Sequence, residues 1–149
     1  MSHKYLNDIG IKSDDIAIFN TEAIDKKRQK RFKKQRKKYS FDERETWALD
    51  FTLVTWLYSH MKAYKKYASK VVDLTFTKFK IPEWDENNHK RSEDFKVVTQ
   101  KKALKIIIKN LEFCLRNYEN ANAVRALECE ERAKYALEII GIILPALWW

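Results

Sequence analysis

Glycine and proline, the residues that chains use most in tight turns, each occur only twice in this sequence of 149 residues. An all-β sandwich or barrel needs many such turns, so this scarcity excludes those folds. The chain still has the apolar material for a core, because 45% of its residues are hydrophobic. A chain of this length typically forms one domain. We therefore expect a single, mainly helical domain.

Three segments have the periodicity of amphipathic helices. The first begins at Ser40-Phe-Asp-Glu43, which matches a capping box, and covers residues 41–69. It is apolar around most of its circumference, which is typical of a central helix that is covered on two sides. The second covers residues 100–119 and has Thr99 as its N-cap candidate. The third runs from about Asn122 to Leu144, where Pro145 should end or kink it.

Residues 71–98 lack this helical periodicity and contain alternating β-branched and aromatic residues. They indicate an extended connection, with room for one short strand near residues 72–81. Together these patterns predict an all-α fold, an antiparallel three-helix bundle with a long central helix over residues 41–149. Residues 1–40 would form an N-terminal arm in front of it.

The arm contains a strongly basic run over residues 26–38. Ten of its 13 residues are lysine or arginine and none is acidic: Lys26, Lys27, Arg28, Lys30, Arg31, Lys33, Lys34, Arg36, Lys37 and Lys38. The run carries +10 while the whole chain carries +9, so the rest of the chain is close to neutral at −1. Closely spaced cations can neutralise phosphates and release their counterions, which predicts sequence-independent nucleic-acid binding. The alternatives are a solvated helix or disordered tail without a partner, and contact with anionic lipid or an acidic protein.

Three polar residues lie on stripes that are otherwise apolar. Asp50 and Asn110 could serve a catalytic or metal site, but a structural ion pair or hydrogen bond with an arginine or lysine of a neighbouring helix is the simpler interpretation. His60 could act as a general base or sit in the core with one nitrogen satisfied. The sequence has no Glu-x-x-His motif, no phosphate-binding glycine loop and no zinc-type cysteine spacing. We therefore expect no enzyme, metal or cofactor, and reduced thiols at Cys114 and Cys129.

The C-terminal segment carries more apolar residues than one helix stripe can bury. A monomeric bundle would expose some of Tyr135, Ile139, Ile142, Trp148 and Trp149. Exposed apolar patches often mark partner surfaces, so homodimerisation or partner binding through these five residues is an alternative function. In a second interpretation, the arm or residues 71–98 fold over the patch, and in a third the apolar run 139–149 contacts a membrane surface. The apolar run 139–149 is too short to span a membrane, and we expect a cytoplasmic protein.

The segments Thr46-Trp-Ala-Leu-Asp50, Val72 to Ile81 and Thr99-Gln100 resemble small, uncharacterised helical proteins encoded by bacteriophages of low-GC bacteria. The resemblance covers about residues 41–119 and excludes the basic run. It implies an all-α fold and the cytoplasm of a host cell, but no reaction. The sequence thus predicts a non-enzymatic, phage-type accessory protein. Its basic arm would bind nucleic acid or a host complex that contains nucleic acid, and it could inhibit a host defence in this way.

Overall fold

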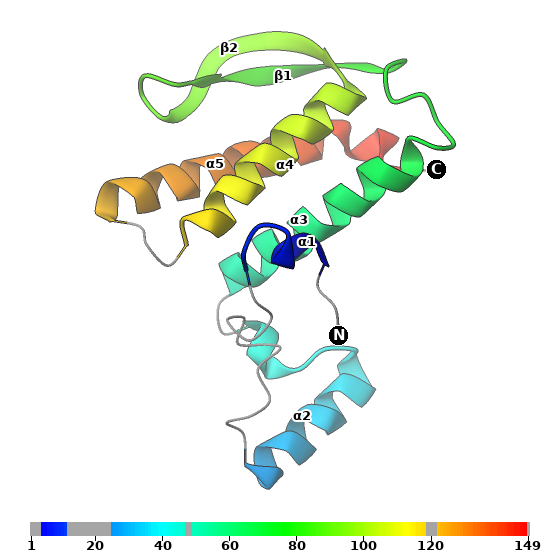
Figure 1. The fold of residues 1–149 in the computed structure, drawn as a ribbon, viewed down its shortest axis with the longest axis vertical. Coiled ribbons are helices and arrows are strands. Elements are labelled where there is room, and N and C mark those ends of the chain that lie inside the picture. Colours follow the sequence, from blue (N-terminus) through cyan, green and yellow to red (C-terminus); the bar gives the residue numbers. More distant parts are fainter. Residues whose placement is uncertain (1–3, 12–24, 47–48, 119–121, 149) are drawn as a thin grey trace.

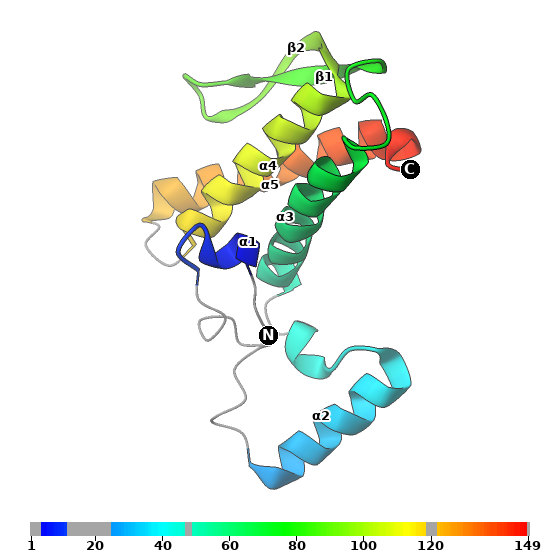
Figure 2. The same ribbon diagram turned by 45° about the vertical axis from the view of Figure 1, so that its right-hand side comes forward.

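The computed structural model describes residues 4–11, 25–46, 49–118 and 122–148 (Figure 1). The α-helices are α1 (Lys4–Asn7), α2 (Lys26–Tyr39), α3 (Leu49–Ala68), α4 (Gln100–Arg116) and α5 (Ala123–Ile143), and the strands are β1 (Lys78–Asp85) and β2 (Lys90–Thr99). Two short 3-10 helices, η2 (Glu43–Thr46) and η3 (Leu144–Ala146), complete the described elements. Helices α3, α4 and α5 pack together, and α2 stands apart from them at the end opposite the strands (Figures 1 and 2).

The prediction of an all-α three-helix bundle is wrong, because residues 78–99 form an antiparallel β-hairpin. Lys78 pairs with Thr99, and the register shifts between Pro82 and Trp84. At the tip, the Asp85 carboxylate accepts hydrogen bonds from the backbone amides of Asn87 and Asn88 at 2.9 and 3.1 Å. The second strand escapes sequence reasoning because most of its residues are polar and only Val98 is buried, so it lacks the alternation that marks a half-buried strand.

The starts of α4 and α5 are confirmed. The Thr99 hydroxyl accepts a hydrogen bond from the amide of Lys102 at 3.2 Å, and the Asn122 side chain accepts one from the amide of Arg125 at 2.8 Å. Each N-cap satisfies an amide that has no partner within the helix. Helix α5 ends at Ile143, immediately before η3, which contains Pro145. Local capping signals therefore place both helices correctly.

The predicted capping box at residues 40–43 is wrong. Ser40 ends α2 in the left-handed region with φ of 70°, and its amide donates to the carbonyl of Arg36 at 2.9 Å. Glu43 begins η2, and its carboxylate binds Gln35 and Arg31 of α2 instead of the amide of Ser40. The basic run lies within helix α2, so Ser40, the residue after this helix, caps its C-terminal end.

The hairpin lies across α4 and α5 and completes the core (Figure 1). Ile81 and Val98 of the hairpin are buried against buried residues of both helices. The Tyr135 hydroxyl of α5 donates to the carbonyl of Pro82 at 2.9 Å, and the Tyr135 ring lies 5.3 Å from that of Trp84. Burial raises the pKa of Tyr135 to about 12, with the negative charges of Glu83 and Glu138 adding to the effect. The phenol therefore remains a hydrogen-bond donor at neutral pH.

This packing corrects the predicted C-terminal patch. Tyr135 is 1% exposed and Ile139 is fully buried, so neither belongs to a surface. Residues 71–98 fold over them, which is the alternative that the sequence left open. The physical reason is that α5 is covered by α4 on one side and by the hairpin on another.

The Tyr135→Phe substitution tests this docking. It leaves the buried carbonyl of Pro82 without its donor, so the free energy of unfolding should fall by about 1–3 kcal/mol. Urea denaturation followed by circular dichroism measures the change. Tyr118→Phe is the matched control because the Tyr118 ring is 48% exposed, and it should change stability by less than about 0.5 kcal/mol. Equal losses in the two variants would show that the hydroxyl of Tyr135 does not hold the hairpin.

Candidate nucleic-acid interface

The basic run forms a well-capped helix. The Asp25 side chain accepts a hydrogen bond from the amide of Arg28 at 2.8 Å, and Ser40 closes the other end of α2. A carboxylate at the start of a helix also interacts favourably with the helix dipole, and cations in the last turn do the same at its end. Arg36, Lys37 and Lys38 lie in that last turn. The sequence therefore stabilises a helix despite the repulsion between its cations.

All three arginines of the run are held in ion pairs. Arg28 pairs with Asp25 at 3.7 Å, Arg31 pairs with Glu43, and Arg36 pairs with Asp42 at 2.6 Å and with Glu45 at 3.1 Å. Three of these four carboxylates lie in the segment just after α2, so the chain reverses and lays them against the helix. Arg31 and Arg36 therefore hold α2 to this segment, and the paired carboxylates offset the charge of all three arginines.

Asp42 is the centre of this contact. Its side chain is fully buried, and the Arg44 guanidinium donates to both of its oxygens, at 2.9 and 2.8 Å. Hydrogen bonds from Arg44 lower the pKa of Asp42, and the positive charge of Arg36 adds to the effect. The guanidinium of Arg44 also lies 4.5 Å from the centre of the Phe32 ring, which is 3% exposed. Phe32 and Asp42 thus form a small core of their own beneath α2.

The seven lysines occupy the opposite side of α2. At about 100° per residue, they fall within an arc of about 140°, while Phe32, Arg28 and Arg36 lie outside it. All seven side chains are exposed, and none forms an ion pair within the described parts of the chain: Lys26, Lys27, Lys30, Lys33, Lys34, Lys37 and Lys38. We call these seven residues the lysine face. It presents ammonium groups along about 18 Å of helix.

A second group of lysines lines a groove of about 410 Å³ between α3 and α4: Lys62, Lys65, Lys66, Lys105 and Lys109. Burial lowers the pKa of Lys65, and the positive charges of Lys105, Lys101 and Lys62 lower it further. The acidic residue in the groove, Glu112, is paired with Arg116 at 2.8 Å. The near-neutral total charge of residues 41–149 therefore hides a basic surface, which a charge sum along the sequence cannot reveal.

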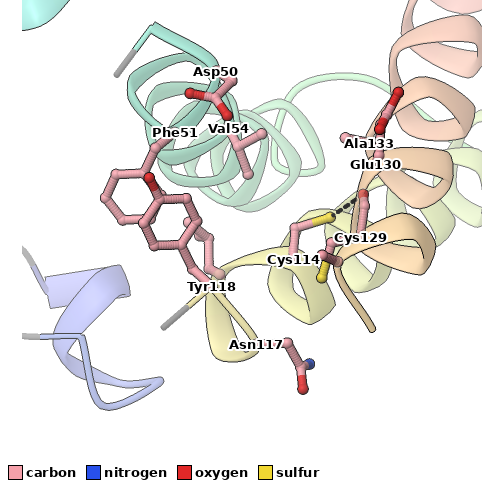
Figure 3. Close-up of a pocket in the computed structure, with 11 residues that line it drawn as sticks. Asp50, Phe51, Val54, Cys114, Asn117, Tyr118, Cys129, Glu130 and Ala133 are labelled. Carbon is pink, nitrogen blue, oxygen red and sulfur yellow. Dashed lines mark hydrogen bonds between the residues drawn. The ribbon is translucent and has the colours of Figure 1, made fainter. Parts of the chain in front are cut away.

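An apolar pocket of about 490 Å³ lies between the N-terminal half of α3 and the adjoining ends of α4 and α5 (Figure 3). Cys114 lines it, and its thiol donates to the carbonyl of Cys129 at 3.1 Å. Burial raises the pKa of Cys114 to about 12, so this group is a thiol at neutral pH and a poor nucleophile. Two carboxylate residues, Asp50 of α3 and Glu130 of α5, also line the pocket (Figure 3). Across residues 4–11, 25–46, 49–118 and 122–148, no group of three or more His, Cys, Asp or Glu side chains could hold a metal ion.

The three polar residues that the sequence places on apolar stripes differ in burial: Asn110 is buried, whereas Asp50 and His60 are exposed. Asn110 accepts a hydrogen bond from Arg132 of α5 at 2.9 Å, which confirms the structural interpretation. Asp50 is exposed in the first turn of α3 and makes no ion pair with a neighbouring helix within the described parts of the chain, so the structural interpretation is wrong for this residue. His60 is also exposed, and its Nδ1 lies 2.7 Å from the carbonyl oxygen of Trp56. The predicted core position of His60 is wrong because that side of α3 faces solvent.

The remaining residues of the predicted C-terminal patch lie at the end of the chain. Ile142 is half-buried, Trp148 is 74% exposed, and Trp149 lies outside the described residues. A partner role for these three residues stays a prediction, on a smaller surface than the sequence suggests.

No protein-family model, curated protein or solved structure matches this chain. The resemblance to bacteriophage-encoded proteins therefore stays a prediction. Among the helices that the structure describes, none combines the length and the apolar composition that a bilayer crossing requires.

The sequence located the basic run but did not distinguish its lysines from its arginines. The signal was present, because a helical projection of residues 26–38 separates the two kinds of cation. The carboxylates at Asp42, Glu43 and Glu45 are the second signal. Four to seven residues beyond the run, they can reach it only if the chain turns back.

The Asp42→Asn substitution tests whether the buried carboxylate holds α2 in place. Removing one charge from a buried ion pair costs several kcal/mol, so the amides of α2 should lose at least about tenfold of their protection from hydrogen exchange. Mass spectrometry of deuterated peptides at pH 7 measures this loss. Glu45→Gln, which removes a half-exposed partner of Arg36, should have a much smaller effect.

The same contact should depend on pH in a defined direction. Because the pKa of Asp42 is lowered in the folded protein, its contribution to stability is complete above the ordinary carboxyl pKa of about 3.9. The contribution is lost as the pH falls through the lowered value. Protection of α2 that declined between pH 7 and pH 5 would contradict this role for Asp42.

Proposed function

We propose that this chain binds nucleic acid without sequence preference through the lysine face of α2. One observation carries the proposal: ion pairs fix the three arginines, while seven exposed lysines share the other side of the same helix. Lysine acts as a point charge toward phosphate and has no planar fork for reading bases. Contact with the phosphate backbone is therefore the chemistry that this surface supports best.

The fixed position of the helix supports the proposal further. A disordered basic tail must lose conformational entropy when it binds, whereas a helix that is already formed has lost most of it. Buried Phe32 and Asp42 hold α2 to the segment after it, so the lysines are presented on a formed scaffold. A solubility tail would need neither the caps nor the ion pairs.

The bacteriophage resemblance supports a non-enzymatic accessory role in an infected host cell. Within that role, the nucleic acid is either free or part of a host complex, and inhibition of a host defence nuclease fits the class. Capture from host lysate with and without nuclease treatment separates the two cases. Partners that are lost after nuclease treatment are held through nucleic acid, and partners that persist contact the protein itself.

Replacing Lys27, Lys30, Lys34 and Lys37 with Gln should weaken binding to duplex DNA and to single-stranded RNA. Glutamine is a good helix former, so α2 should persist. On duplex DNA, each phosphate contact contributes roughly 0.9 to the slope of log K against log salt concentration, so that slope should become shallower by up to about 3.6. Fluorescence anisotropy across a salt series measures both quantities.

The matched control replaces four hairpin lysines, Lys78, Lys80, Lys90 and Lys96, with Gln. Each variant lowers the formal charge from +9 to +5, so the two differ only in where the charge is removed. The control should retain the wild-type salt slope. Equal losses in both variants would show that net charge alone drives binding, and no binding by the wild type at low salt would refute the proposed function.

A further inference from the structure

Helix α3 carries an apolar stripe on the side that faces away from the core. Its members are spaced alternately by four and three residues along the whole helix: Leu49, Leu53, Trp56, His60, Ala63 and Tyr67. We call these six residues the α3 stripe. The four largest apolar members are 61%, 41%, 55% and 45% exposed, in chain order (Leu49, Leu53, Trp56, Tyr67). The sequence predicts a helix that is covered on two sides, and the described residues cover only one.

Within the described residues, the position of the hairpin explains why the α3 stripe is uncovered. The hairpin contacts α4 and α5 and makes no comparable contact with α3. Core residues Leu57, Tyr58 and Met61 turn the opposite side of α3 toward α4. Figures 1 and 2 show α3 at the outside of the helical layer. Large side chains exposed in one continuous row usually mark an interface.

The spacing of the stripe identifies the kind of partner. Alternation by four and three residues averages 3.5, the repeat that lets two helices pack knobs into holes. The row runs over 19 residues, from Leu49 to Tyr67, a length of about 27 Å. A second helix with the same repeat is therefore the matching surface.

A second copy of this chain supplies that helix. The spacing of the stripe reads the same in both directions, so an antiparallel copy brings every member opposite another. Leu49 then faces Tyr67, Leu53 faces Ala63 and Trp56 faces His60 of the second copy. Large residues face smaller ones, as packed layers require. A two-fold symmetric interface needs only one self-complementary surface on each chain.

The lysines of α3 do not oppose such a pair. Lys62, Lys65 and Lys66 line the groove toward α4, on the side of the helix away from the stripe. Two helices of this length buried along one side remove on the order of 1,200 Å² from solvent, the lower end of the range for stable interfaces.

We propose that two copies of this chain form an antiparallel dimer in which the α3 stripe of one copy packs against that of the other. The proposal is independent of nucleic-acid binding, since no residue of the lysine face takes part. It also uses residues other than the C-terminal ones that the sequence suggested.

Sedimentation equilibrium of the full chain tests the dimer. The wild type should have twice the mass of one chain, which is 17.9 kDa, and the Leu53→Glu, Trp56→Glu variant should be monomeric with Kd raised at least about 100-fold. The matched control is Val124→Glu, Leu127→Glu on α5, where the two residues are 74% and 65% exposed. The control should remain a dimer. A monomeric wild type, or equal behaviour of the two variants, would overturn the proposal.

Cysteine cross-linking tests the arrangement with milder changes, in a Cys114→Ser, Cys129→Ser background. The Leu53→Cys, Ala63→Cys variant should form disulfide-linked dimers under mild oxidation, because the two positions face each other across the antiparallel pair. Leu53→Cys alone should not, because its two copies would lie about 15 Å apart along the helices. Efficient cross-linking of Leu53→Cys alone, or none in the double variant, would overturn the antiparallel dimer.

Discussion

The packing of the folded core depends on the buried guanidinium of Arg132. It donates to Asn110 of α4 at 2.9 Å and to Glu128 of its own helix at 3.0 Å. Its central carbon lies 4.6 Å from the Trp84 ring of β1 and 4.3 Å from the Phe113 ring of α4. One side chain of α5 therefore contacts both the neighbouring helix and the hairpin. Burying a charge is costly unless it is paired, and here ion pair, hydrogen bond and two aromatic faces share the cost.

The docking of the hairpin around Arg132 decides which surfaces remain free. Because the hairpin covers the side of α5 that carries Tyr135 and Ile139, these two residues of the predicted C-terminal patch are buried. On the other side of α5, Leu137 is 41% exposed, and Leu144, the first residue of η3, is 63% exposed. Periodicity identifies the helix correctly, but a helix that is apolar on several sides does not indicate which side meets its neighbours.

Short-range signals in this sequence predict structure well, and long-range contacts account for the failures. Thr99 and Asn122 act within three residues, and both helix starts are confirmed. The contact between Tyr135 and Pro82 joins residues 53 positions apart, and no local pattern encodes it. Ser40 matches a capping motif, yet the helix that precedes it makes it a C-cap. A capping motif can therefore be interpreted only when the secondary structure of the residues before it is known.

The candidate nucleic-acid interface is likewise predicted in part by the sequence and decided in part by long-range contacts. Composition alone locates the cations of α2, because ten charges in 13 residues need no structural context. Which cations are available depends on the carboxylates after α2, which reach the helix only when Asp42 is buried. The groove between α3 and α4 could not be predicted, because its lysines come from helices separated by the whole hairpin.

The proposed dimer gives these basic surfaces a common geometry. In an antiparallel α3 pair, the C-terminal end of one helix lies beside the N-terminal end of the other. The groove of one copy therefore lies at the same end of the pair as the segment that leads to α2 of the second copy. Each end then holds the lysine groove of one chain beside the start of α3 of the other, and the two ends are about 30 Å apart. Two linked polyanion sites bind one long molecule more tightly than either binds alone, without any new contact, because the second binding event becomes intramolecular. A nearly neutral core with localised lysines suits this arrangement, since it confines attraction to the ends of the pair.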